Sequence, residues 1–128
     1  MAHEVVLVVE DSEAAYEQVR DAAARLGLST EWALNGAEAL RLCRLRPFAA
    51  IVLDLYLPLL DGFSFLRLRK NEKSQDAPVL VISASARKEE IDRALGLGAI
   101  AFLQKPLDGE RLDALLRQLV GRESRADG

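Results

Sequence analysis

The sequence predicts an α/β fold with a doubly wound, parallel, five-stranded sheet. Short apolar runs rich in β-branched residues recur along the 128 residues, and segments with apolar residues at helical spacing lie between them. Strands that alternate with helices of this length are joined by right-handed crossovers, which makes the sheet parallel and covers both of its faces. The chain is therefore expected to form one domain of five strand-then-helix units.

The five apolar runs are the predicted strands. All but the second are continuously apolar and short, as in strands that are buried on both faces, so four fully buried strands are expected. The predicted strands are Val5–Val9, Thr30–Leu34, Ala49–Leu53, Val79–Ile82 and Ile100–Leu103.

A helix is expected after each strand. Gly27 and Gly98 end the first and fourth helices, and Asn35 and Asp61 cap the second and third. Residues 1–120 make up the predicted domain, and residues 121–128, which are charged, small and aperiodic, are expected to form a disordered tail. The predicted helices are Ser12–Leu26, Ala37–Leu45, Phe63–Lys70, Arg87–Leu97, and a last one from Leu107 or Asp108 to Leu119.

Composition excludes several classes of protein. The net charge of −3 provides no basic surplus for binding nucleic acid. No apolar run is long enough to span a membrane, and no signal peptide is visible. The single cysteine, Cys43, rules out an internal disulfide and lies at an apolar position of a predicted helix, where a core role is expected. We therefore expect a cytoplasmic domain that contacts neither nucleic acid nor membrane.

Polar residues follow the buried strands at the point where each strand ends. Glu10 and Asp11 follow the first strand, Asp54 the third, Ser83 the fourth and Lys105 the fifth. Five strands suit the flavodoxin-like order 2-1-3-4-5, in which strands one and three flank the switch point where ligands bind. Three carboxylates meeting there repel one another and need a cation, and oxygen ligands suit Mg²⁺.

The same edge of the sheet has the parts needed for phosphoryl transfer. Lys105 offers a positive charge and Ser83 a hydroxyl, both of which suit phosphoryl oxygens. A carboxylate can act as the nucleophile and form an aspartyl-phosphate, and Asp54 is the best candidate because it is single, central in the sheet and followed by a loop. Asp11, which precedes Ser12, could equally be only the cap of the first helix.

These residues in this order resemble a response-regulator receiver domain of the CheY-like superfamily, the module that takes a phosphoryl group from a histidine kinase in two-component signalling. The resemblance covers residues 4–120. Its departures, such as Ser83 where threonine is commoner, remove no chemical role. It rests on Val9-Glu10-Asp11, Leu53-Asp54-Leu55-Tyr56-Leu57-Pro58 with Asp61-Gly62, Ile82-Ser83-Ala84, Gly98-Ala99 before Phe102, and Lys105-Pro106.

The resemblance implies a role for each residue of the site. Asp54 is the implied phosphoacceptor, and Ser83 and Lys105 the implied contacts of the phosphoryl oxygens. The implied ligands of Mg²⁺ are Glu10, Asp11, Asp54 and the backbone carbonyl of Tyr56. The family often has a cis peptide bond between the lysine and the proline.

The resemblance also implies a switch. Ser83 closes on the phosphoryl group and Phe102 rotates into the vacated space, although plain core packing is an equally good interpretation of Phe102. Tyr56 and Ser85, each two residues past a site residue, influence how water reaches the acyl phosphate. The chemistry is limited to self-phosphorylation and self-dephosphorylation, so the domain is not expected to be an enzyme in the usual sense.

The implied partners are proteins. A histidine kinase or phosphotransfer protein supplies the phosphoryl group, and a downstream effector binds the face made by the fourth helix, fifth strand and fifth helix. Asp108, Glu110, Arg111 and Arg117 are its expected exposed polar residues. The domain is expected to be a monomer or a phosphorylation-dependent dimer.

Three other functions compete with the signalling switch. One is a pseudo-receiver that binds partners without phosphorylation. Another is an Mg²⁺-dependent phosphatase with an aspartate nucleophile, although Tyr56 occupies the position where such enzymes have a second acid. The last is a flavin binder of the same fold, although no Ser/Thr/Gly-rich phosphate loop follows the first strand.

Overall fold

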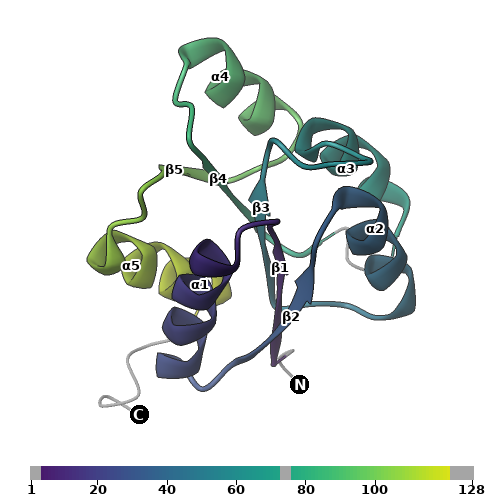
Figure 1. Ribbon diagram of the computed structural model, residues 1–128. Helices are drawn as coiled ribbons and strands as arrows, with labels where there is room; N and C mark the ends of the chain where they lie inside the picture. Colours follow the sequence, from purple (N-terminus) through teal and green to yellow (C-terminus); the bar gives the residue numbers. More distant parts are fainter. Residues whose placement is uncertain (1–3, 73–75, 122–128) are drawn as a thin grey trace.

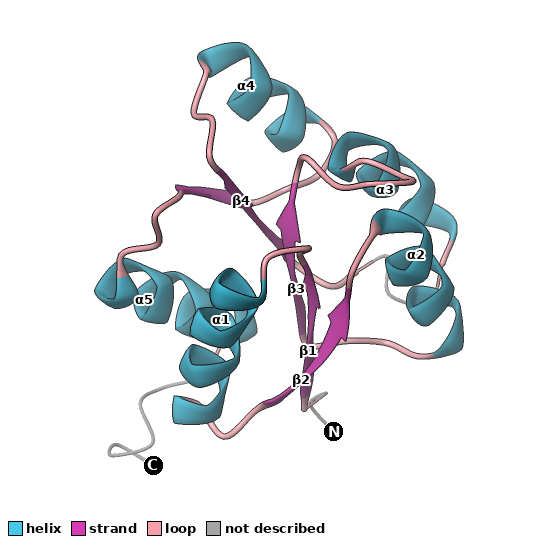
Figure 2. Ribbon diagram, viewed as in Figure 1, coloured by secondary structure: helices cyan, strands magenta, loops and turns pink. Residues whose placement is uncertain are grey.

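The computed structural model describes residues 4–72 and 76–121, which form a parallel sheet with strand order β2-β1-β3-β4-β5 and helices on both faces (Figures 1 and 2). The predicted fold class and strand order are thus confirmed. The strands are β1 (Val5–Val9), β2 (Ser29–Ala33), β3 (Ala50–Asp54), β4 (Val79–Ser83) and β5 (Ala101–Gln104).

The helices divide between the two faces of the sheet. Helices α1 and α5 cover one face, and α2, α3 and α4 lie over the other (Figure 1). Their bounds are α1 (Glu13–Arg25), α2 (Gly36–Leu45), α3 (Gly62–Leu68), α4 (Lys88–Gly96) and α5 (Gly109–Val120), with a 3₁₀ turn, η1 (Arg69–Asn71), directly after α3.

The central strands are apolar throughout because both of their faces are covered. In β1, Leu7 and Val9 pack in the core beneath α2 and α3, whereas Val6 and Val8 pack in the core beneath α1 and α5. None of these four side chains is exposed, and burying each stabilises the fold by about 2 kcal/mol. Cys43 is buried in the first of these cores, as the sequence predicted. The sheet that results holds the carboxyl ends of its strands in fixed positions.

Side-chain caps fix where the helices begin. Ser12 accepts a hydrogen bond from the N–H of Ala15 and caps α1, which resolves the alternative for Asp11: it is not the cap. Asn35 and Asp61 cap α2 and α3, as predicted. Asp11 is therefore left free of a structural role in the helix.

The predicted bounds of the two edge strands were wrong. β2 begins and ends one residue earlier than expected, and Leu34, placed inside the strand, is half-exposed beyond it. Ile100 is exposed and precedes β5, whose Ala101 and Phe102 are only partly buried. An edge strand has one neighbour, so an apolar run there does not require burial on all sides.

Other boundaries moved by smaller amounts. The predicted third helix continues to Lys70, but α3 ends at Leu68 and the chain tightens into η1. Along residues 4–72 and 76–121 no helix is long and apolar enough to cross a membrane. The tail expected over residues 121–128 lies, apart from Gly121, outside the described residues.

Candidate functional site

The carboxyl ends of β1 and β3 bring three acids together, as the strand order predicts. Val9 pairs with Leu53, so the residues that come next, Glu10 just after β1 and Asp54 at the end of β3, share one edge of the sheet. One carboxylate oxygen each from Glu10, Asp11 and Asp54 lie within 4.8 Å of one another. Glu10 and Asp54 are buried, whereas Asp11 is exposed at the rim.

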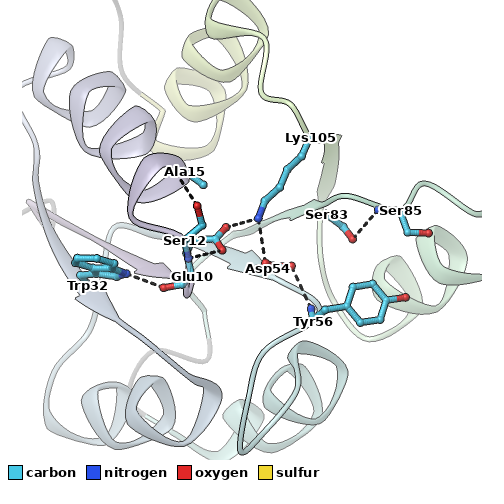
Figure 3. A network of polar contacts seen from close by, with 9 residues as sticks. All are labelled: Glu10, Ser12, Ala15, Trp32, Asp54, Tyr56, Ser83, Ser85 and Lys105. Atoms are coloured by element: carbon cyan, nitrogen blue, oxygen red, sulfur yellow. Dashed lines mark hydrogen bonds and ion pairs between the residues drawn. The ribbon is translucent and has the colours of Figure 1, made fainter.

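Lys105 is the positive charge that meets two of these acids (Figure 3). Its Nζ lies 2.7 Å from Glu10 Oε1 and 3.1 Å from Asp54 Oδ2. The Lys105 backbone N–H donates to the carbonyl of Ser83 at 2.8 Å, which extends the β4–β5 ladder past its end and fixes where the side chain begins. The Lys105–Pro106 peptide bond is cis.

The charges of this cluster shift one another's protonation. Burial is the main cause that raises the pKa of Glu10 from 4.5 to about 7; the charge of Asp54 adds to this rise and the Lys105 ammonium opposes it. Burial alone would lower the pKa of Lys105, but its contacts with the carboxylates of Glu10 and Asp54 outweigh burial and hold that pKa above its ordinary value. One ammonium cannot balance three carboxylates, so the cluster suits an added cation.

The loop after Asp54 holds the second oxygen of this carboxylate. Asp54 Oδ1 accepts a hydrogen bond from the N–H of Tyr56 at 3.1 Å. Gly62 lies so close beneath the loop that a Cβ there would approach the Asp54 carbonyl oxygen to 2.8 Å. A side chain at Gly62 would therefore displace the loop. The Tyr56 ring is half-exposed and points away from Glu10 and Lys105 (Figure 3).

Ser83 lies at the same edge but its hydroxyl is directed elsewhere. Ser83 Oγ is fully buried and accepts a hydrogen bond from the N–H of Ser85 at 3.2 Å. Ser85 Oγ in turn donates to Glu90 Oε1, on α4, at 2.5 Å. Phe102, on β5, packs against the core beneath α2, α3 and α4. The hydroxyl, unlike Lys105, makes no hydrogen bond to Asp54 within the described residues.

Two residues of this region escaped the sequence analysis. Glu90 joins the loop after β4 to α4, and no motif distinguishes it from the neighbouring acids of that helix. Trp32 donates its indole N–H to the carbonyl of Glu10 at 2.7 Å. Its one distinguishing feature in the sequence is that it is the only tryptophan of the chain, which does not reveal its contact with Glu10.

The predicted effector face needs one correction. Asp108, Glu110 and Arg111 are exposed at the start of α5, as expected. Arg117 is partly buried, and it lines a small pocket with Ala22, Arg25 and Asp113, on the side where α5 meets α1. Its position about two helical turns after the start of α5 did not reveal which neighbour it faces.

Comparison with known proteins gives a consistent result. The family model described as "Response regulator receiver domain" matches residues 6–117. The "Response regulator MprA" of Mycobacterium sp. (strain KMS) is 37% identical over 96% of this chain and 53% of its own length. The chain spans about half the length of the curated relatives it matches.

Two solved structures bear on the site. The receiver domain of the sensor histidine kinase PA1611 from Pseudomonas aeruginosa PAO1, which has a magnesium ion coordinated in its active-site cleft, is 26% identical with a TM-score of 0.82, over 94% of this chain and 99% of that one. A response regulator from Burkholderia pseudomallei with a phosphorylated aspartic acid, a calcium ion and citrate is 28% identical with a TM-score of 0.78, over 91% and 66%.

Proposed function

Because the chain belongs to the response regulator receiver domain family, we propose that it is a phosphorylation-dependent signalling switch whose phosphoacceptor is Asp54. The observation that carries this proposal is the meeting of the acidic cluster and Lys105 at one buried carboxylate, 3.1 Å from Lys105 Nζ. The phosphorylated aspartic acid of the Burkholderia pseudomallei neighbour supports it. Members of this family are signalling modules that accept a phosphoryl group, and they are not enzymes that turn over a substrate.

The acidic cluster fits Mg²⁺. It offers only oxygen ligands, which a small hard cation prefers, and the Pseudomonas aeruginosa neighbour has a magnesium ion coordinated in its active-site cleft. Bound Mg²⁺ would neutralise carboxylate and phosphoryl charge. The residues that would hold it are Glu10, Asp11, Asp54 and the backbone carbonyl of Tyr56.

In the proposed reaction, an Asp54 oxygen attacks the phosphorus of a phosphohistidine on a histidine kinase or phosphotransfer protein. The new P–O bond forms as the P–N bond breaks, and the imidazole leaves and takes a proton from solvent. Lys105 and Ser83 then bind phosphoryl oxygens. Water later cleaves the acyl phosphate, which releases inorganic phosphate and restores Asp54. The neighbouring Tyr56 and Ser85 control how this water approaches the acyl phosphate.

The proposed switch begins at Ser83. Its hydroxyl leaves the N–H of Ser85 to donate to the phosphoryl group, and the loop that follows pulls on α4 through Ser85 and Glu90. Phe102 then moves into the space that this closure vacates. The resulting change alters the α4–β5–α5 face, to which an effector protein or a second copy binds in the cytoplasm.

Phosphoryl uptake tests the proposal. The domain is incubated with Mg²⁺ and acetyl phosphate, and the intact mass is measured. We expect one added phosphoryl group, none in Asp54→Asn, and normal uptake in Asp61→Asn, because Asp61 only caps α3. A wild-type domain that takes up nothing and binds no beryllofluoride would be a pseudo-receiver, and multiple turnover on a phosphomonoester would indicate the phosphatase.

A further inference from the structure

Trp32 lies outside the acidic cluster but contacts its backbone. This residue stands opposite Val8 in the β1–β2 pairing, and its indole Nε1–H donates to the carbonyl of Glu10 at 2.7 Å (Figure 3). The Glu10 N–H donates to the carbonyl of Ala33 at 3.0 Å, as the last bond of the ladder. Because β2 ends at Ala33, the next carbonyl along β1, that of Glu10, accepts its hydrogen bond from the Trp32 indole and not from the β2 backbone.

The indole is itself held firmly in place. Its ring stacks on that of Tyr16, on α1, with centroids 4.3 Å apart and planes inclined by only 3°. The Tyr16 hydroxyl shares a hydrogen bond of 2.9 Å with Thr30, which is on the same face of β2 two residues before Trp32. The stacked pair of Trp32 and Tyr16, which joins β2 to α1, therefore fixes the direction of the indole N–H. The indole side chain is not free to rotate.

The bond controls the direction of the next residue. The Glu10 carbonyl and the Asp11 N–H belong to one rigid peptide plane, so a bond that orients the carbonyl also orients the start of Asp11. The Asp11 carboxylate makes no hydrogen bond or ion pair of its own with the described residues. Glu10, by contrast, is also held through its carboxylate by Lys105 and by the N–H of Ser12. The backbone alone therefore aims Asp11.

We propose that Trp32 is a positioning residue for the acidic cluster, because its indole N–H fixes the Glu10–Asp11 peptide plane and so directs Asp11 to the metal site. This inference rests on the proposed function, since the site is the same. Its consequence is that removing the indole N–H weakens Mg²⁺ binding although Trp32 touches neither the metal nor the phosphoryl group.

An isosteric replacement isolates the N–H. Because the chain has one tryptophan, growth of a tryptophan auxotroph on β-(3-benzothienyl)alanine replaces Trp32 alone, with sulfur in place of N–H and the ring shape retained. Mg²⁺ is titrated and followed by backbone amide resonances around Asp54. We expect affinity to fall about five-fold, the effect of one net hydrogen bond. In the unmodified domain, the single indole N–H resonance should shift during the same titration.

Tyr16→Phe is the matched control. It removes one hydrogen bond from the same aromatic pair, the bond to Thr30, but keeps the stack and the bond from Trp32 to Glu10. We expect it to lower the melting temperature and leave the Mg²⁺ affinity unchanged. A merely structural role for Trp32 would make both variants lose stability alike and neither lose affinity.

The outcomes separate this inference from the proposed function. Equal Mg²⁺ affinity in the isostere and the unmodified domain, or an indole resonance that Mg²⁺ does not move, overturns the role of Trp32 and leaves the function standing. A wild-type domain that binds neither Mg²⁺ nor beryllofluoride overturns both.

Discussion

The site edge of the sheet has two halves that differ in how they are held. In the charged half, both oxygens of Glu10 and both of Asp54 already have partners, and Lys105 joins the two acids. In the hydroxyl half, made of Ser83 and Ser85, the contacts lead away to Glu90 on α4. The groups that hold charge are thus assembled in advance, whereas the hydroxyl must turn before it can meet a phosphoryl group.

The largest expected effect is the pH dependence of the charged half. The pKa of Glu10 is about 7 in the folded domain and 4.5 in its ordinary state. Between these two pH values the Glu10 carboxyl keeps its proton in the folded state and loses it in the unfolded state. The free energy of unfolding therefore falls as pH rises through this window, by roughly 3 kcal/mol without Mg²⁺. Urea unfolding at several pH values measures it. Glu10→Gln should lose this part of the decline, and equal slopes in the two proteins would contradict the account.

Removing the ammonium tests the same half from the other side. Lys105→Met leaves Glu10 and Asp54 without their shared cation, and we expect it to lower the free energy of unfolding by about 2 kcal/mol, less than for a fully buried pair because Lys105 is partly exposed. Added Mg²⁺ should restore part of the loss. Lys88→Met is the control, because its exposed pair with Asp92 contributes little. Equal effects of the two substitutions would mean that the charged half is not specially held.

The hydroxyl half is tested at its far end. Glu90→Gln weakens the charge-assisted bond from Ser85, and we expect a loss of about 1 kcal/mol in urea unfolding together with a shifted Ser85 amide resonance. Glu89→Gln removes the same charge from the same first turn of α4, so it controls for the helix dipole. A Ser85 resonance that moves equally in both variants would show that Glu90 does not hold the loop.

The smallest expected effect concerns the lifetime of the acyl phosphate. Tyr56→Gly removes a half-exposed ring two residues past Asp54, and we expect the phosphorylated domain to hydrolyse several-fold faster because water approaches more easily. The half-life is followed by intact mass after the phosphodonor is removed. An unchanged half-life would show that this position does not govern dephosphorylation.

The same two halves differ in how far the sequence could predict them. Glu10, Asp11 and Asp54 were found because parallel strands place their carboxyl ends at one edge, and a continuous apolar run marks each strand. The direction of the Ser83 hydroxyl depends on which nearby group it hydrogen-bonds, here the N–H of Ser85. The position of a serine at the end of a strand does not predict that choice.

The errors in the fold have a related cause. Ile100 and Leu34 are exposed apolar residues next to the two edge strands. Each continues an apolar run, so the sequence does not distinguish them from the buried residues of that run. Trp32 was missed because its contact to Glu10 joins two strands through one side chain and belongs to no motif. Patterns along the chain predict the scaffold, whereas single contacts between elements require the structure.

The structure of the domain with Mg²⁺ and beryllofluoride tests the central claim most directly. The account predicts beryllofluoride on Asp54, with Lys105 still beside this carboxylate and the Ser83 hydroxyl moved from the Ser85 N–H to a fluorine. A domain that binds beryllofluoride elsewhere, or one in which Ser83 keeps its bond to Ser85 while Asp54 is occupied, would contradict it.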